Sequence, residues 1–324
     1  MRHQGRKRPF QRSGNSGTTS SESSMKITKP GIFRGVSDAD YRADPCPTPS
    51  LTQSLVKVLI ERSPQHAWEQ SPRLNPQFEY DDDTKFDLGN IAHRLILGRG
   101  KEITVLDYAD WRKKDAQEAR EIAADQGRIA VLKHQFEQAS DMAAAAWKQL
   151  SKHEDRDAFT NGDAEVMIAW EENGIWFRSL IDWLHTDLRT IDDFKSTGMS
   201  VAPHVIGIRA EAAGWHVQAA FIERGLDILD PAGAGRRRYR FIAQETDKPH
   251  ALTVMHMNEY WQTMGRKKVE AGIALWRPAV EHNYWRNYGT KAVIPEYPGF
   301  KEKQWLDREE SGEFEPDTKL IMAG

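Results

Sequence analysis

Residues 164–197 read AEVMIAWEENGIWFRSLIDWLHTDLRTIDDFKST, and this stretch decides the fold. From Val166 to Trp170, hydrophobic residues recur at every second position, which is typical of a strand with one buried face. Asn173-Gly174 follows and favours a tight turn, because both residues tolerate a positive φ. An apolar run from Ile175 to Leu184 then returns. The stretch therefore predicts a β-hairpin whose second strand carries one acid, Asp182.

A third strand is expected from Arg189 to Lys195, and it carries polar residues in an apolar setting. Asp193 and Lys195 point the same way, because side chains two positions apart on a strand share a face. If the strands are neighbours, Asp182 faces them. Buried carboxylates repel each other and unpaired ions are costly, so a hard divalent cation would resolve the conflict. A lysine beside a metal-bound water would orient it, deprotonate it or stabilise the developing charge.

The spacing of these residues resembles a known nuclease signature. Asp182 followed by Asp193-Phe194-Lys195 is similar to the motif of the PD-(D/E)XK superfamily. The segment GNIAH, ending at His93 on an expected helix, resembles the histidine motif of the RecB-type branch, and Gln218 in WHVQAAF matches its glutamine motif. The ordered series is similar to RecE-type exonucleases and their phage and prophage relatives.

The resemblance implies a fold and a metal site. The fold is α/β, with a restriction-endonuclease-like core in which helices flank a mixed central sheet. Mg²⁺, with Mn²⁺ as a substitute, would be held by His93, Asp182, Asp193 and the Phe194 backbone carbonyl. Lys195 would position or deprotonate the attacking water.

Further residues are assigned supporting roles. Glu165, at the head of the hairpin, matches an acidic position of the family pattern, although a surface glutamate is an equal alternative. Gln218 would hold the substrate strand or orient the lysine. Phe221 departs from the family, which more often has a hydroxyl-bearing aromatic residue there. DNA contacts are expected from Gln218 and from arginines: Arg178, which precedes Asp182 on the same strand, and Arg236, Arg237 and Arg238 in GAGRRRYR.

Composition narrows the class of protein. The net charge of −3 does not by itself indicate a nucleic-acid-binding protein, so local clusters must supply any positive surface, and solvated surface is the alternative for each. A single cysteine, Cys46, excludes an intramolecular disulfide and an all-cysteine metal cluster, which favours a reducing cytoplasm. No apolar run approaches the roughly 20 residues that span a bilayer, so no membrane association is expected.

The chain is expected to form one large domain with tails. Residues 1–24 are basic and rich in serine and glycine, which predicts a disordered leader. A nuclease domain is expected over 25–310, with a helical insertion at 113–151, and a C-terminal tail over 311–324. Helical spacing predicts one helix from Ser50 that ends at Ser63-Pro64, where the next helix begins, and another around GNIAH. Two helices are expected within 113–151, and strands are expected at 103–107 and 238–244.

The implied function is a metal-dependent DNA exonuclease that acts on the ends of linear duplex DNA. The resemblance implies 5′ to 3′ degradation that leaves 3′ overhangs for recombination, with a single-strand annealing recombinase as a candidate partner. A structure-specific endonuclease of the same fold and a non-catalytic DNA-end-binding phage protein are the alternatives. A homo-oligomer remains open.

Overall fold

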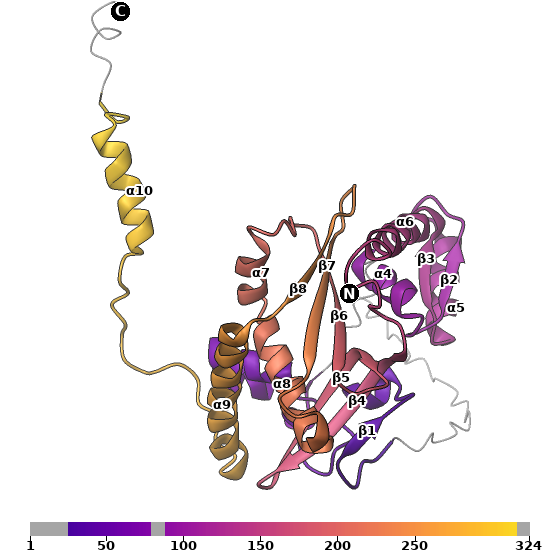
Figure 1. The fold of residues 1–324 in the computed structure, drawn as a ribbon, viewed down its shortest axis with the longest axis horizontal. Helices are drawn as coiled ribbons and strands as arrows, with labels where there is room; N and C mark the ends of the chain where they lie inside the picture. Colours follow the sequence, from indigo (N-terminus) through magenta and orange to yellow (C-terminus); the bar gives the residue numbers. More distant parts are fainter. Residues whose placement is uncertain (1–24, 79–87, 316–324) are drawn as a thin grey trace, which may run out of the picture. The chain divides into compact units, whose positions relative to one another are not determined.

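The computed structural model describes residues 25–78 and 88–315 and divides the chain into two units, one ending at Arg286 and one beginning at Asn287 (Figure 1). The leader predicted over 1–24 lies outside the described residues, as does 316–324 of the predicted tail. We expected the main domain to reach 310, whereas the first compact unit closes at Arg286. The second unit contains α10 (Gly299–Glu310), a helix that the sequence analysis did not foresee.

A six-stranded mixed sheet forms the centre of the first unit, so the predicted α/β class is confirmed (Figure 1). Only the pairing of β6 with β7 is parallel among the strand pairs of this sheet. The strand order is β1 (Gly31–Phe33), β4 (Gly162–Glu172), β5 (Ile175–His185), β6 (Thr190–Thr197), β7 (Arg238–Glu245) and β8 (Leu252–His256).

The predicted hairpin is strands β4 and β5, which pair in antiparallel register from Glu172–Ile175 to Gly162–His185. Asn173 and Gly174 form the two-residue turn with φ values of 51° and 84°. A two-residue turn with positive φ at both positions matches the right-handed twist of the strands it joins. The local signal therefore set both the position of the hairpin and its register.

One face of the sheet packs against helices from both ends of the chain. Aromatic and aliphatic residues of β4 and β5, such as Trp170 and Phe177, meet Val56, Phe221 and Trp276 from three helices in one buried cluster. Ser63 caps the helix that begins at Pro64, as predicted. The elements on this side are α2 (Gln53–Glu61), α3 (Pro64–Glu69), α7 (Ile206–Ala212), α8 (Trp215–Leu229), the short 3₁₀ turn Pro231–Gly233 and α9 (Glu259–Glu281).

The opposite face is covered by α4 (Leu88–Leu97) and α6 (Lys133–Leu150), whose apolar residues pack on Phe194 and Ile242 (Figure 1). The two helices expected within 113–151 are present as α5 (Lys114–Asp125) and α6. The sequence analysis missed β3 (Ile129–Leu132) between them, which pairs in parallel with β2 (Ile103–Leu106). Helix α6 packs directly on the central sheet and covers its core on this side.

Strand β4 changes direction at Glu165, which has a φ of 52°. Alternation would place the residues on either side of Glu165 on one face. Instead, Ala164 joins the cluster under α4 and α6, and Val166 joins the cluster under α8. The backbone conformation of one residue therefore lets β4 contribute to both hydrophobic layers.

The remaining helix of the first unit, α1 (Asp38–Arg42), is short and is capped by Ser37. Within residues 25–78 and 88–315, every helix is too short or too polar to traverse a lipid bilayer.

Candidate active site

The centre of the candidate site is a pair of residues on β6. Lys195 Nζ lies 2.6 Å from Asp193 Oδ1, as expected for side chains that share a strand face. The other oxygen of Asp193, Oδ2, accepts hydrogen bonds from Gln218 Nε2 at 2.5 Å and from the Tyr239 hydroxyl at 2.9 Å. The Asp193 side chain is 1% exposed. An acid this deeply buried keeps one orientation because three side chains from three different elements hold it.

Asp182 lies where strands β5 and β6 separate. The two strands pair at Leu184–Ile191 and Trp183–Asp192, so continued pairing would bring Asp182 opposite Asp193. At this step the Phe194 backbone N–H donates to Asp182 Oδ2 at 3.0 Å. The carboxylate therefore satisfies a strand amide, and its position is fixed by the backbone of the next strand.

Helix α4 brings His93 to the same place. His93 Nε2 lies 3.2 Å from Asp182 Oδ2, and the imidazole ring stands 6.1 Å from the Phe194 ring, centroid to centroid. The packing of α4 on Phe194 explains this placement, because the apolar face of the helix seats on the sheet beside the strand that carries Asp193. The predicted histidine motif thus reaches the predicted acids.

Glu165 enters the site from β4. Burial raises the pKa of the Glu165 carboxyl, and the charges of His93 and Asp182 act on it as well. Its Oε1 lies near Gly100, where an added Cβ would come within 3.6 Å of it. Glu165 is half-buried, and the charges of His93 and Asp182 reach its carboxyl.

Burial and charge oppose each other throughout the site. The pKa of Asp193 is raised to about 6, because burial and the negative charge of Asp182 outweigh the lowering effect of Lys195. Burial also acts to raise the pKa of Asp182, but His93 outweighs it and the pKa is lowered. The pKa of His93 is raised, because Asp182 overcomes the burial of the ring. Each of the two acids is thus paired with one basic side chain, Asp182 with His93 and Asp193 with Lys195.

The pKa values of Lys195 and Tyr239 favour their protonated forms. Burial disfavours the charged form of Lys195, yet Asp193 and Asp182 raise its pKa above the usual value. Burial and the charge of Asp193 raise the pKa of Tyr239. The tyrosine therefore stays protonated and donates to the carboxylate, and the lysine stays an ammonium.

The side chains of the site are of the types that bind a divalent cation, although they are not arranged as a complete set of metal ligands. Within the described part of the chain, no three carboxylate, imidazole or thiolate groups are arranged to hold a metal ion. Asp182 and Asp193 are engaged by His93 and Lys195 instead. Asp193 Oδ1 is buried and lies against the Lys195 ammonium. Oxygen-rich sites with like charges are typical of Mg²⁺.

Two of the arginines that we expected to contact DNA are committed to internal ion pairs. Arg178 is buried and lies 3.1 Å from Asp44, with further bonds to Ser50 and the Tyr41 carbonyl. The Arg237 side chain is 2% exposed and binds Asp227, Asp230 and nearby carbonyls. Burial of both guanidinium groups makes them poor phosphate contacts, because an entering phosphate would have to displace carboxylate partners.

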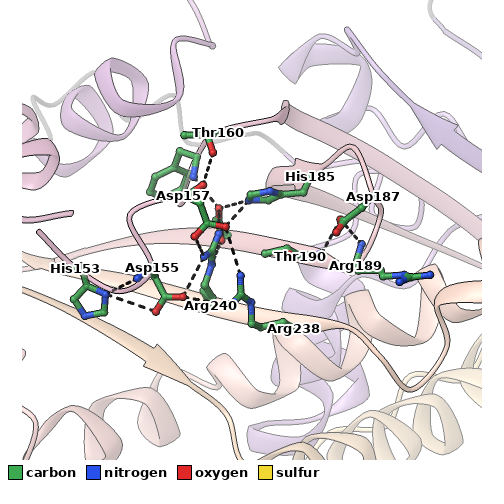
Figure 2. A network of polar contacts seen from close by, with 12 residues as sticks. His153, Asp155, Asp157, Thr160, His185, Asp187, Arg189, Thr190, Arg238 and Arg240 are labelled. Atoms are coloured by element: carbon green, nitrogen blue, oxygen red, sulfur yellow. Dashed lines mark hydrogen bonds and ion pairs between the residues drawn. The ribbon is translucent and has the colours of Figure 1, made fainter. Parts of the chain in front are cut away.

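The other two arginines of that cluster have different surroundings. Arg236 is exposed and donates to the Ala232 carbonyl. Arg238 is half-exposed and stands 3.6 Å from both Asp155 and Asp157. Figure 2 shows this second polar cluster, in which Arg240 is the centre.

The Arg240 network lies on the sheet face that carries α6, next to but apart from the site. Arg240 is fully buried and binds Asp192 at 2.5 Å through Nε and at 2.9 Å through Nη2. It also reaches Asp155 and Asp157 in the segment between α6 and β4. His185 Nε2 contacts the same Asp192 at 2.7 Å. The network ties this segment to β6 at the residue preceding Asp193.

The sequence analysis missed Tyr239, which completes the shell around Asp193. Its strand, β7, pairs in parallel with β6, and Ile191 lies opposite Tyr239. The strand itself was expected near 238–244, but its partner was not evident. Phe221, the residue noted as lacking a hydroxyl, is fully buried between Trp170 and Phe177 and takes no part in the site.

One family model and a solved structure are similar to this chain. No curated protein matches the sequence. A crystal structure of a protein from Eubacterium rectale named "Putative exonuclease" is similar with a TM-score of 0.52 at 12% sequence identity, over 77% of this chain and 90% of that one. At this identity the likeness shows the fold alone. A family model described as "PDDEXK-like domain of unknown function (DUF3799)" matches residues 53–293, which include every residue that converges on the site. The chain therefore belongs to this family of PDDEXK-like domains.

Proposed function

We propose that this protein is a metal-dependent exonuclease that degrades linear duplex DNA. The family and the fold support a nuclease. The observation that carries the proposal is the meeting of Asp182, Asp193 and Lys195 from two strands at one point, with His93 and Gln218 from helices on opposite sheet faces. A fold that served only as a scaffold would gain little from burying two repelling carboxylates there.

The side chains divide the work of phosphodiester hydrolysis among them. His93, Asp182, Asp193 and the Phe194 carbonyl would hold Mg²⁺, which when bound supplies positive charge against the phosphate and lowers the pKa of water. Lys195, as an ammonium, orients the attacking water and stabilises negative charge that develops on the phosphate oxygens. Gln218 and Tyr239 fix the orientation of Asp193 through its Oδ2. Glu165 adds a carboxylate on the His93 side of the site.

The proposed direction of degradation rests on the sequence resemblance to RecE-type enzymes. We propose attack from 5′ ends that leaves 3′ overhangs. Such overhangs are substrates for a single-strand annealing recombinase, which is the partner class that this reaction would serve. Duplexes labelled at either the 5′ or the 3′ end of one strand test the direction, since 5′ to 3′ degradation releases the 5′ label as the first product.

The central experiment compares wild type with Lys195→Met on linear and covalently closed circular duplex DNA, in Mg²⁺ and in EDTA. We expect nucleotide release from linear DNA only, dependent on Mg²⁺ and absent in the variant. Lys248→Met is the matched control, because this lysine is exposed and its ammonium faces Asp141 rather than a residue of the site. Undiminished release by Lys195→Met refutes the assignment.

The two alternatives give distinct results in the same assay. An endonuclease of this fold would nick or linearise the closed circle. A non-catalytic DNA-end-binding protein would retain linear duplex in a binding assay and release no nucleotides in any metal. The pairing of Lys195 with Asp193 supports a catalytic protein over a non-catalytic DNA-end-binding one.

A further inference from the structure

One side of helix α2 carries two polar side chains, Gln53 and Lys57, that bond to other elements of the first unit. Gln53 Oε1, in its first turn, accepts a hydrogen bond from the buried Ser179 hydroxyl of β5 at 3.0 Å. Lys57 follows one turn later on the same side of the helix. Its Nζ donates to the Ala213 carbonyl at 3.1 Å, at the end of α7. The lysine thus bridges α2 and the segment that leads into α8.

Gly214 makes room for the Lys57 side chain. An added Cβ at Gly214 would stand 2.5 Å from Lys57 Cδ, and the glycine has a φ of 68°. Gly214 immediately precedes α8, the helix whose Gln218 holds Asp193. The stem of Lys57 is therefore seated against the beginning of a helix that shapes the site.

The charges of two site residues, Lys195 and Asp193, act on the Lys57 ammonium. Burial lowers its pKa, the positive charge of Lys195 lowers it further, and the negative charge of Asp193 raises it. Among the described residues Lys57 has no carboxylate within salt-bridge distance. Lys268, by contrast, is paired with Glu211 at 2.9 Å. Asp193 is already paired with Lys195, and Asp182 with His93, so the positive charge of Lys57 is left for an incoming anion to neutralise.

We propose that Lys57 binds a backbone phosphate of the DNA strand that is cut, adjacent to the phosphodiester at Lys195. This inference rests on the proposed function and adds a substrate contact that neither the motif nor the family description assigns. Lys57 is a binding residue in this scheme, and the bond cleaved is still acted on by Lys195. A phosphate contact of this kind carries no base specificity and contributes to affinity mainly through charge.

The test measures binding without cleavage. In an Asp182→Asn background, a fluorescein-labelled duplex with a 5′ phosphate is titrated at several KCl concentrations. We expect Lys57→Met to weaken binding about fivefold at low salt and to reduce the slope of log affinity against log salt by about one. Lys57→Arg should restore both quantities, and Lys248→Met should change neither. A slope for Lys57→Met equal to that of the parent overturns the inference.

A kinetic comparison in the active protein separates this inference from the proposed function. Lys57→Met should raise KM for linear duplex and leave kcat nearly unchanged, because Lys57 does not touch the reacting atoms. If wild type cuts DNA and Lys57→Met keeps both its KM and its salt slope, only the inference fails. If wild type cuts no DNA but Lys57→Met still loses salt-dependent binding, the proposed function fails and the phosphate contact stands.

Discussion

The backbone N–H of Phe194 donates to the Asp182 carboxylate at the step where β5 and β6 part. A side chain thereby takes the place of a backbone acceptor in the strand pairing. Asp182 therefore has two roles, as a candidate metal ligand and as the acceptor for a strand N–H. Different substitutions at this position separate the two roles.

Asp182→Asn should abolish cleavage and largely preserve the fold, because the amide oxygen can still accept from Phe194. Asp182→Leu should abolish cleavage and also lower the free energy of unfolding by about 1–3 kcal/mol, since it leaves a strand N–H without its acceptor. Urea denaturation and a nucleotide-release assay measure the two effects. Equal stability of the two variants would mean that the Phe194 bond contributes nothing to the strand junction.

Tyr239→Phe should reduce the rate of cleavage on the order of tenfold or more, the effect expected from losing one hydrogen bond to a charged group. Gln218 would remain as the sole amide donor to Asp193 Oδ2, so some activity should persist. Tyr260→Phe is the control, because that tyrosine is 73% exposed. A Tyr239→Phe enzyme with wild-type kcat would show that Gln218 alone orients the acid.

Addition of Mg²⁺ or Mn²⁺ should raise the melting temperature of wild type, because a ligand that binds only the folded state stabilises it by about 2.7 kcal/mol at a hundredfold excess over Kd. Asp193→Asn should lose this shift, and EDTA should reverse it in wild type. Asp141→Asn, at an exposed acid that faces Lys248, is the control and should keep the shift. A metal-induced shift that survives in Asp193→Asn would place the cation elsewhere.

Arg240→Met should destabilise the fold by about 3–5 kcal/mol, because it leaves the buried Asp192 without its cation. Burial acts to raise the pKa values of Asp155 and Asp157, but hydrogen bonds from His256 to Asp155 and from Arg240 to both hold them below the usual 3.8. An acid with a lowered folded pKa stabilises the protein above its unfolded pKa, and this contribution is lost as the pH falls through the lowered value.

The stability of wild type should therefore decrease as the pH falls below about 4, and the decrease should be shallower in Arg240→Met. Urea denaturation at a series of pH values measures both. Arg236→Met, which removes an exposed arginine bonded to the Ala232 carbonyl, serves as the control. Parallel pH profiles for wild type and Arg240→Met would contradict the account of the network.

Local signals explain what the sequence predicted well. The Asn173-Gly174 turn and the alternation before it depend on neighbouring residues, so the hairpin and its register could be read directly. The spacing from Asp182 to Lys195 then placed the main site residues, because it spans one turn between adjacent strands. His93 and Gln218 required the family resemblance, since a single histidine or glutamine on a helix carries no signal of its own.

Features that depend on distant contacts were missed or misread. Tyr239 reaches Asp193 through a parallel pairing of β6 and β7 that no local pattern indicates. Arg178 and Arg237 were read as DNA contacts because charge clusters do not reveal burial or carboxylate partners. Strand β3 was overlooked because its four residues lie within a stretch of helical composition and pair with a strand far upstream in sequence.

Glu165 occupies a backbone conformation that L-residues other than glycine adopt at a cost of about 1–2 kcal/mol. The chain nevertheless carries a carboxylate at this position between the two layers, and strained residues of this kind cluster at functional sites. Glu165→Gly would relax the main chain, so the variant should melt at a higher temperature but cleave DNA more slowly. Thermal stability and reaction rate therefore place opposite demands on this position.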